Sequence, residues 1–441
     1  MADKIKRKDA DTEAAEYMEL QMKLSDKSKA SNIVLIILTL GFIFAFAILF
    51  WVMPDNDFSA EENRTLQKAP EMTFENLFSG NLTDEFSDYM ADQFPFRNFF
   101  VGVKGVVETA QVKLQNNSVI LGKDGYLIAR NDYPDEKNLK TNISSIGNFI
   151  KAAEEKGIEC HPAFAGRKQD VLEQKIPEVY GMEASDRIWK ILDEDCRAAG
   201  FDYLNLRDAF RQLESTDPTV YGDLYYRNDH HWNSLGAYYA YALLVSELGE
   251  TPYALTDFEK EVASEDFFGT TWSSAGIKWV KGDELDYYRW GKADDDLMSA
   301  DRNFTMKILE PSKRFEGYEG CHYIEEDGKT YAFFEDGYFV REFLNEKDKY
   351  ASFIGGNFGY TEITQKRSDR EIILILKDSF SHSMVQFLAR HYNLIMIDLR
   401  YYSSSIMKLC EEKGINKVIF LYNMETLTEG PYLKILNSGL K

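Results

Sequence analysis

Two kinds of apolar run follow one another along this chain: one long run near the N-terminus and many short runs after it. The long run, residues 33–53, contains no charged residue. As a helix rising about 1.5 Å per residue it would span about 31 Å, close to the hydrocarbon thickness of a bilayer. A buried helix of this length normally keeps a polar face, and this run has none. The pattern therefore predicts a transmembrane helix over 33–53.

Charged residues flank this run asymmetrically. Basic residues precede it (Lys4, Lys6, Arg7, Lys8, Lys23, Lys27 and Lys29), and acidic residues follow it (Asp55, Asp57, Glu61 and Glu62). Because positive flanks stay on the cytoplasmic side, we expect residues 1–32 to form a cytoplasmic tail and the chain after Pro54 to lie outside the cell. A cleaved signal peptide is the alternative, but its apolar core is usually shorter, and no Ala-x-Ala site follows here.

The segment after the membrane run is polar with aromatic interruptions. Residues 54–115 predict one or two amphipathic helices in a juxtamembrane segment, broken at Pro95 in "QFPFR". "VILGKDGYLIAR", residues 119–130, predicts a β-hairpin with "GKDG" as its turn. We expect the main extracellular domain to occupy residues 116–441.

From about residue 142 short apolar runs alternate with helical patterns. Strands are expected over 158–166, over 201–210 including the exit of that strand, over 372–376 before a polar loop, and over 393–402 and 416–423. Helices are expected over 145–157, 184–200, 381–392 and 403–414. Continuous apolar strands between helices are typical of a parallel sheet covered on both faces. Residues from about 251 to 370 break this pattern and predict an irregular, β-rich insertion.

Composition narrows the function classes. The chain has 441 residues, 44% of them hydrophobic, and a net charge of −22, which argues against a nucleic-acid partner because phosphate binding needs a basic face. The four cysteines are far apart and show neither a zinc signature nor a dense disulfide framework, so only one or two disulfides remain open (Cys160, Cys196, Cys321 and Cys410).

Polar residues stand where the parallel strands are expected to end, which is where open parallel sheets place their active residues. They are Lys377–Ser379, Asp398–Arg400 and Asn423. A fourth polar group, Asp229–His231 in "DHHW", also follows an expected strand and opens a helix.

Ser379 is the candidate nucleophile. A strand-to-helix turn exposes its hydroxyl and leaves backbone N–H groups free. A serine needs a general base, which His231 can supply while Asp229 fixes the imidazole tautomer. Asn423 can donate to the oxyanion. The alternative is structural: Ser379 and Asp229 are both residue types that cap helices.

A metal site is a further alternative for Asp229, His230 and His231. Side chains of adjacent residues usually diverge, and zinc sites prefer spaced ligands. "DHH" also resembles a manganese phosphoesterase motif, but the other ligands of that motif are not evident. The remaining histidines make no metal-binding pair, and we expect the last two to be surface or packing residues (His161, His322, His382 and His391). We therefore expect neither a metal nor an organic cofactor.

Several motifs resemble the bacterial DHHW family, in the same order along the chain: "FSAEENRTLQKAP", "DQFPFRNFF", "GKDGYL", "NDHHWNSLGAYYAY", "FFGTTWSS" and "ILKDSFSHSMVQFLARHY". That family is similar to the SGNH-hydrolase-like domains of the alginate O-acetylation proteins of the J and X type. The resemblance implies a three-layer α/β sandwich, circularly permuted so that the histidine motif precedes the serine. It also implies a triad of Ser379, His231 and Asp229, with His230 in the variable position.

The chain departs from the usual SGNH pattern at the oxyanion hole. Lys377 replaces the glycine before Asp-Ser, and "YNME" replaces the Gly-x-Asn-Asp block. Oxyanion or substrate contacts are therefore expected from Asn423, Arg400, His230 and Asp378.

These expectations describe a membrane-anchored, extracytoplasmic serine acyltransferase or esterase acting on O-acetyl groups of a cell-surface or exported polysaccharide. A membrane-bound O-acyltransferase would be the partner that supplies acetyl groups. The alternative is a non-catalytic polysaccharide-binding or scaffold protein of a cell-envelope modification complex. The distance between the Ser379 hydroxyl and the His231 imidazole discriminates between them, since the enzyme needs about 3 Å.

Overall fold

A computed structural model describes residues 10–440 except 60, 62–63, 75–77, 79–80, 112, 131–133, 182, 292–300 and 367–368. The chain divides into two compact units. The first comprises residues 1–60 and 64–101, and the second comprises residues 61–63 and 102–441.

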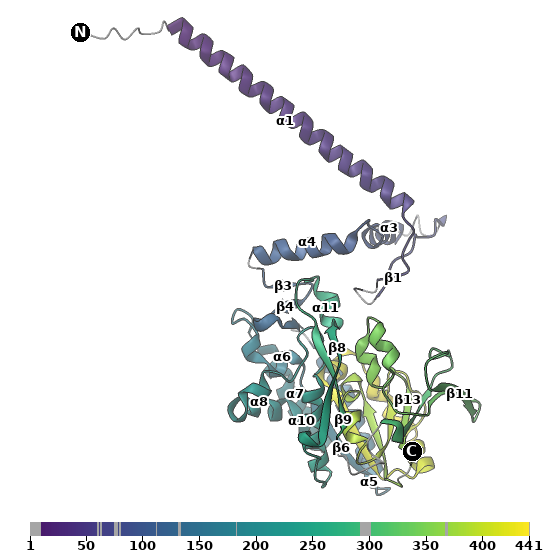
Figure 1. Cartoon of the computed structure of the whole chain (residues 1–441). Coiled ribbons are helices and arrows are strands. Elements are labelled where there is room, and N and C mark those ends of the chain that lie inside the picture. The colour runs from purple at the N-terminus through teal and green to yellow at the C-terminus, as the bar shows by residue number, and fades with distance from the viewer. Residues whose placement is uncertain are drawn as a thin grey trace. The chain divides into compact units, whose positions relative to one another are not determined.

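The first unit is built around the long helix α1, Ala10–Val52 (Figure 1). In the described part of the chain, α1 is the one helix long and apolar enough to cross a membrane. It begins well before residue 33, so part of the predicted tail is helical as well. The short strands β1, Phe58–Ser59, and β2, Arg64–Thr65, follow it. The helices α3, Asn81–Asp92, and α4, Arg97–Ala110, are separated at Pro95, where the pattern predicts a break. α4 begins in the first unit and continues into the second from residue 102.

A nine-stranded sheet forms the centre of the second unit, in the order β11-β12-β10-β13-β15-β14-β16-β6-β7. From one edge to the other its strands are Cys321–Glu326, Lys329–Phe334, Phe304–Leu309, Tyr360–Gln365, Asn393–Ile397, Ile372–Lys377, Lys417–Asn423, Glu159–Ala165 and Leu204–Asn205. The five strands from β15 to β7 are parallel, and the other four are antiparallel. The five strands predicted for a parallel sheet are thus confirmed as parallel, and the four antiparallel strands come from the segment expected as an insertion.

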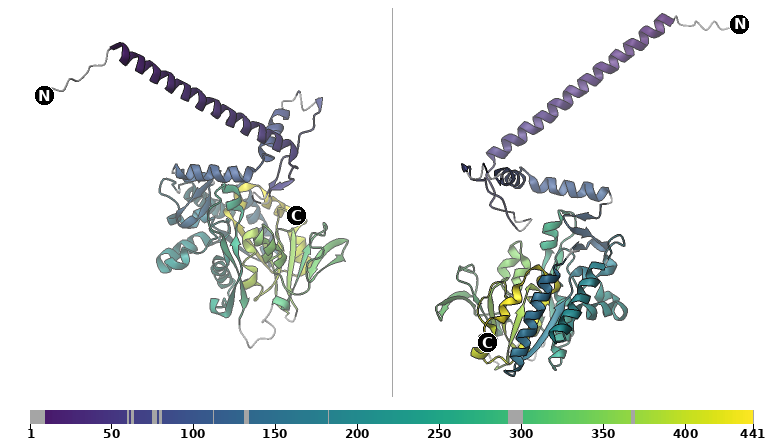
Figure 2. Two further views of the ribbon diagram at one scale, coloured as in Figure 1. Left: turned by 45° about the horizontal axis from the view of Figure 1, so that its top comes forward. Right: turned by 180° about the vertical axis from the view of Figure 1, so that it is seen from behind.

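Helices cover both faces of this sheet, as a three-layer sandwich requires (Figure 2). Alternate residues of β14 face opposite cores. Ile373 and Ile375 pack in the core shared with α8, Leu206–Thr216, and α10, Ser234–Glu247. Leu374 and Leu376 pack in the other core, with α5, α7, α13 and α14, which span Glu136–Glu154, Glu183–Ala199, Ile406–Lys413 and Met424–Glu429.

Two smaller sheets complete the second unit. The predicted hairpin is confirmed as β4, Val119–Leu121, and β5, Leu127–Ala129, with β3, Gln115–Asn116, beside β4. β8, Phe258–Phe267, and β9, Asp283–Trp290, form a separate antiparallel ribbon.

The segment expected as an insertion is β-rich, but β10 to β13 lie in the central sheet rather than outside it. Two further predictions are wrong in detail. The expected strand over 201–210 is only the two-residue β7, because α8 begins at Leu206. The expected helix over 381–392 is reduced to the 3-10 turn η7, Ser379–Ser381, and the single-turn α12, Val385–Leu388.

Candidate active site

Ser379 follows directly on the loop at the carboxyl end of β14. Asp378, and not Ser379, is the N-cap residue of the turn, and its carboxylate accepts a hydrogen bond from the Phe380 N–H at 2.9 Å. The other carboxylate oxygen accepts from the Asn423 N–H at 2.6 Å, which ties the ends of β14 and β16 together. Asp378 therefore positions the loop, and the Ser379 hydroxyl is left for other contacts.

Asp229 and His231 lie in the loop between Tyr225 and Trp232, whose backbones form an isolated bridge. The next helix, α10, is capped by Asn233, which accepts from the Gly236 N–H. Helix capping therefore does not explain Asp229.

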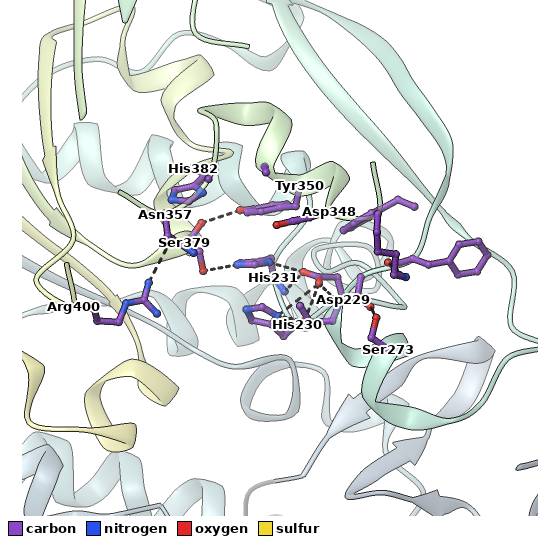
Figure 3. Close-up of a pocket in the computed structure, with 17 residues that line it drawn as sticks. Asp229, His230, His231, Ser273, Asp348, Tyr350, Asn357, Ser379, His382 and Arg400 are labelled. Atoms are coloured by element: carbon purple, nitrogen blue, oxygen red, sulfur yellow. Dashed lines mark hydrogen bonds and ion pairs between the residues drawn. The ribbon is translucent and has the colours of Figure 1, made fainter. Parts of the chain in front are cut away.

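The structure brings Ser379, His231 and Asp229 into one row (Figure 3). The distance from Ser379 Oγ to His231 Nε2 is 2.6 Å, and that from His231 Nδ1 to Asp229 Oδ1 is 2.5 Å. The same Asp229 oxygen accepts from the His231 backbone N–H at 3.0 Å. The candidate nucleophile, the candidate base and the carboxylate that would orient it are thus all within hydrogen-bond reach, across 148 residues of sequence.

Burial sets the charge states of this row. It lowers the pKa of His231 to about 4, and the neighbouring His230 adds to that shift, so the imidazole is neutral at neutral pH. Burial also opposes the charge on Asp229, but the imidazoles of His231 and His230 outweigh it and hold the pKa of that carboxyl well below its usual range. A neutral imidazole beside an ionised carboxylate can accept the proton of a serine hydroxyl.

The other oxygen of Asp229 is held by the segment around "FFGTTWSS". Thr270 donates to it from its backbone N–H at 2.8 Å and from its hydroxyl at 3.1 Å. A side chain on Gly269 would overlap Asp229, so the close approach requires glycine. His230 Nδ1 lies 2.6 Å from the Thr270 hydroxyl. Gly269 and Thr270 lie in one of the motifs shared with the DHHW family, but nothing in their local sequence predicts this contact with Asp229.

Tyr350 packs against His231, a contact that no sequence pattern predicts. Its ring stacks on the His231 ring at 3.9 Å with an interplanar angle of 7°. Its hydroxyl donates to the Ser379 carbonyl oxygen at 3.1 Å and lies 3.2 Å from the Ser383 hydroxyl. Tyr350 therefore contacts both the base and the loop of the nucleophile. No local pattern marks it among the 26 tyrosines.

Trp232, the last residue of "DHHW", links the same two loops. Its indole N–H donates to the Phe380 carbonyl at 2.9 Å and to the Ser383 hydroxyl at 3.1 Å. The side chain is fully buried.

A buried network of ionisable side chains lies next to the loop that contains Ser379. Asp398 accepts two hydrogen bonds from the Arg400 guanidinium, at 2.9 and 2.7 Å. Lys377 Nζ lies 3.6 Å from Asp398 and 2.8 Å from His382 Nε2. Burial lowers the pKa of both Lys377 and His382. His382 and His391 are buried, so packing rather than the surface explains them. Lys377, which stands where the SGNH pattern has a glycine, is therefore a member of this ion network.

Two cavities meet at Ser379, and His230, Thr270 and Arg400 also line both. The first, of about 250 Å³, contains His231, Tyr350 and Asn357. The second, of about 310 Å³, is bounded by Asp378, Asn423, Glu425 and Glu429. Asn423 caps α14 through its oxygen, and its amide nitrogen makes only a long contact of 3.4 Å to the Ala165 carbonyl.

A cation is a poor fit to "DHH". Asp229, His230 and His231 can offer ligand atoms within 4.8 Å of one another. Both nitrogens of His231 are already engaged, however, one by Asp229 and one by Ser379. A metal bound to His231 would displace one of these hydrogen bonds.

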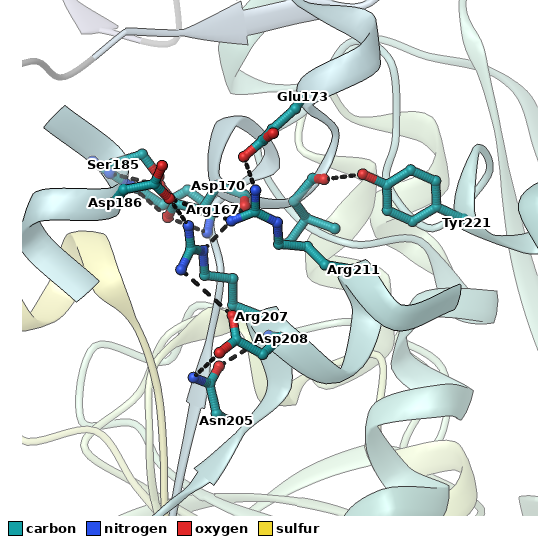
Figure 4. A network of polar contacts seen from close by, with 11 residues as sticks. Arg167, Asp170, Glu173, Ser185, Asp186, Asn205, Arg207, Asp208, Arg211 and Tyr221 are labelled. Carbon is teal, nitrogen blue, oxygen red and sulfur yellow. Dashed lines mark hydrogen bonds and ion pairs between the residues drawn. The ribbon is translucent and has the colours of Figure 1, made fainter. Parts of the chain in front are cut away.

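A second polar network anchors the loop that follows β6 (Figure 4). Arg167 and Asp170 form a buried bidentate pair, and the Ser185 hydroxyl donates to the same carboxylate at 2.6 Å. Tyr225, at the start of the "DHHW" loop, donates to the Gly166 carbonyl at 2.7 Å. The charges of this network are paired, and the network lies outside both cavities, so its role is structural. It holds the loop after β6, to which Tyr225 of the histidine loop is hydrogen-bonded.

All four cysteines are free.

Comparison with known proteins confirms the resemblance drawn from the motifs. Residues 119–271 match the family described as the SGNH hydrolase-like domain of the acetyltransferase AlgX. The probable alginate O-acetylase AlgJ of Pseudomonas aeruginosa is 22% identical over 178 residues, which are 40% of this chain and 44% of that protein. The match therefore spans less than half of this relative.

Two solved structures share the fold. A DHHW family protein from Eubacterium siraeum is 18% identical, with a TM-score of 0.54, and the match covers 73% of this chain and 96% of that one. PatB1 of Bacillus cereus, solved with a sulfonyl adduct, is 21% identical, with a TM-score of 0.56, and the match covers 73% and 99%. The second unit thus has an SGNH-hydrolase-like fold.

Proposed function

We propose that this chain is a serine O-acetyltransferase or acetylesterase that acts on O-acetyl groups of a cell-surface or exported polysaccharide. One observation carries the proposal: Ser379 Oγ lies 2.6 Å from His231 Nε2, and Asp229 holds the other imidazole nitrogen at 2.5 Å. Similarity to the AlgX acetyltransferase family and to the probable alginate O-acetylase AlgJ supports the choice of acetyl chemistry.

The reaction has two halves. His231 Nε2 takes the proton of Ser379 as the oxygen attacks the acetyl carbonyl, and the leaving alcohol then receives that proton. In the second half His231 deprotonates a sugar hydroxyl or water, which attacks the acetyl-serine and releases Ser379. A sugar acceptor makes the enzyme a transferase, and water makes it an esterase.

Two groups are suited to stabilise the oxyanion. Among the described residues, no contact engages the backbone N–H of Ser379, which lies beside its own nucleophilic oxygen. The Asn423 amide lines the second cavity. Among the described residues its nitrogen makes only a long hydrogen bond, to the Ala165 carbonyl, which it can exchange for a hydrogen bond to the oxyanion. One such donor is typically worth roughly 2.7–4 kcal/mol. Arg400 and His230 are placed to contact the acceptor, because they line both cavities.

The acceptor that we propose is an uncharged or amino-bearing glycan. Glu425 and Glu429 are exposed, stand one turn apart on α14 and line the second cavity. Two carboxylates at this position would repel a polyuronate such as alginate. Alginate, which is a polyuronate, is therefore not the acceptor that we propose for this chain.

We further propose that α1 anchors the chain in the cell membrane, with its N-terminus cytoplasmic and the second unit outside. Transfer at that site needs an acetyl donor outside the membrane, so a membrane-bound O-acyltransferase is the proposed partner.

The histidine loop precedes the serine loop along the chain, as a circularly permuted SGNH order requires.

The test is acetylation of the full-length chain in detergent. With a chromogenic acetyl ester, intact-mass analysis should find one acetyl group, mapped to Ser379, and it should be absent in Ser379→Ala and in His231→Ala. Ser246→Ala and His322→Ala, both exposed, are matched controls that keep the adduct. A sulfonyl fluoride gives a second readout that needs no acetyl donor. A folded chain that forms neither adduct, or an adduct that survives Ser379→Ala, contradicts the proposal. Adding a neutral oligosaccharide then separates transfer from hydrolysis.

A further inference from the structure

Aromatic side chains of the first unit gather on α1 within its apolar run. The Phe46 ring stacks on the Phe94 ring with centroids 5.4 Å apart, and its edge contacts are to Phe96 at 6.4 Å and Phe100 at 5.6 Å. These three residues come from the break at Pro95 and the first turn of α4. One turn further along α1, Phe50 packs at 5.5 Å against Tyr89 of α3.

The position of Phe46 sets a depth. Between Phe46 and Met53, where the apolar run ends, a helix rises about 10 Å at about 1.5 Å per residue. Side chains that pack on Phe46 are therefore held about that far inside the apolar stretch, and not at its end. If α1 spans a bilayer, they lie among the acyl chains of the outer leaflet.

Phe96 and three neighbouring apolar side chains of this unit have apolar surface left uncovered. Phe96 is 57% exposed and Phe99 is 66% exposed, and on α3 Phe86 and Met90 are 41% and 44% exposed. A patch of this kind marks an interaction surface more often than a water-facing one.

The polar groups of this segment are gathered into a cluster of their own. Asp92 accepts two hydrogen bonds from the Arg64 guanidinium and one from the Gln67 N–H at 2.8 Å. The Tyr89 hydroxyl, on the residue that packs on Phe50, reaches the Asp55 carboxylate at 3.1 Å. An aromatic ring with its body on the apolar helix and its hydroxyl on a carboxylate is suited to the membrane–water boundary.

We infer that residues 94–100 form an aromatic wedge that inserts into the outer leaflet beside α1 and binds phospholipid acyl chains. The inference rests on the proposed membrane anchor and is independent of the proposed acetyl chemistry. The juxtamembrane segment is then a lipid-bound element in which α4 begins within the outer leaflet, and not a spacer.

The test uses the full-length chain in lipid nanodiscs that contain a phosphatidylcholine with a diazirine in the middle of one acyl chain. After irradiation, peptide mass spectrometry should find lipid adducts on residues 94–100 as well as on 33–53. Val179 and Tyr401, exposed at 77% and 61% in the second unit, are internal controls that should carry none. Phe96→Asp with Phe99→Asp should reduce the adducts on 94–100 at least tenfold, whereas Val179→Asp should not.

The outcomes separate the wedge from the anchor. Adducts on 33–53 without any on 94–100 overturn the wedge and leave the anchor standing. Adducts on neither segment overturn the anchor and the wedge together. Acetylation of Ser379, measured on the same preparation, is expected to be present in each case, so a failure of the proposed chemistry is recognised separately.

Discussion

The parallel half of the central sheet and the segment of residues 258–291 and 301–366 meet at the same cavities but contribute different things. The carboxyl ends of β14, β15 and β16, with the loops that follow them, bring Ser379, Arg400 and Asn423. The other segment brings Thr270, which fixes Asp229, and Tyr350, which covers His231. The first region supplies groups suited to react, and the second holds the reacting row in place. Changes in the two regions should therefore differ in size and in kind.

The largest effect is expected for Asp229→Asn. The imidazole would lose the carboxylate that orients it and stabilises its charged form, so kcat with an acetyl ester should fall about 10³- to 10⁴-fold with little change in KM. Asp327→Asn, in the turn between β11 and β12, is the control. A loss of less than tenfold would remove Asp229 from the mechanism.

Gly269→Ala tests the holding segment at the same carboxylate. The added methyl group would overlap Asp229 and push it from His231, and a displacement of about 1 Å can cost about 10²-fold in rate. Gly222→Ala is the matched control, since its new methyl group would meet the carbonyl oxygens of Pro218 and Thr219 at ordinary contact distances of 3.5 and 3.8 Å. Equal rates for the two variants would show that the close approach is unimportant.

Tyr350 allows its two contacts to be separated. Tyr350→Phe removes the hydroxyl and should cost about 1 kcal/mol, or about fivefold in kcat. Tyr350→Leu also removes the stack on His231 and should cost about 1 kcal/mol more. The two rates, measured with the same ester, should therefore differ about fivefold. If they are equal, the stacked ring contributes nothing to catalysis.

The pH profile should show the burial of the base. With the pKa of His231 at about 4, the imidazole is neutral above that pH, so kcat/KM should be flat near neutrality and fall as the pH drops through about 4. His230→Gln removes a neighbouring charge that disfavours protonation of His231, so the acid limb should move to higher pH. A wild-type limb near pH 6.5 would mean that the base is solvated.

The smallest effect is expected at the cavity wall. Glu425→Gln with Glu429→Gln should raise the transfer rate to an acidic oligosaccharide a few-fold at low salt and leave a neutral acceptor unaffected, because exposed charges interact weakly and are screened. Initial rates at two salt concentrations measure this. An equal change for both acceptors would contradict a charge effect.

The same division explains what could be predicted from sequence. β14, β15 and β16 are built on short apolar runs bounded by polar residues, and the ends of these runs pointed to Ser379, Arg400 and Asn423. The "DHHW" motif pointed to His231 and Asp229. These features are local, so a single segment displays each of them.

The missed features are not local. Tyr350 stacks on His231, which lies 119 positions earlier in the sequence. Nothing in the segment around Tyr350 marks that contact. β10 alternates buried and half-buried residues, as an antiparallel strand does, but its place beside β13 depends on tertiary pairing. The expected helix over 381–392 fails because every residue in that segment is buried, so no helical period distinguishes an inner face.

The strand order has a consequence for biogenesis. β6 and β7 join the rest of the sheet only through β16, which is the last strand to be synthesised and lies between β6 and β14. The segment with Asp229 and His231 is synthesised before residues 417–423, so the sheet can close only when synthesis is nearly complete. A chain still being synthesised lacks the strand between β6 and β14 and therefore cannot yet hold Ser379, His231 and Asp229 in one row.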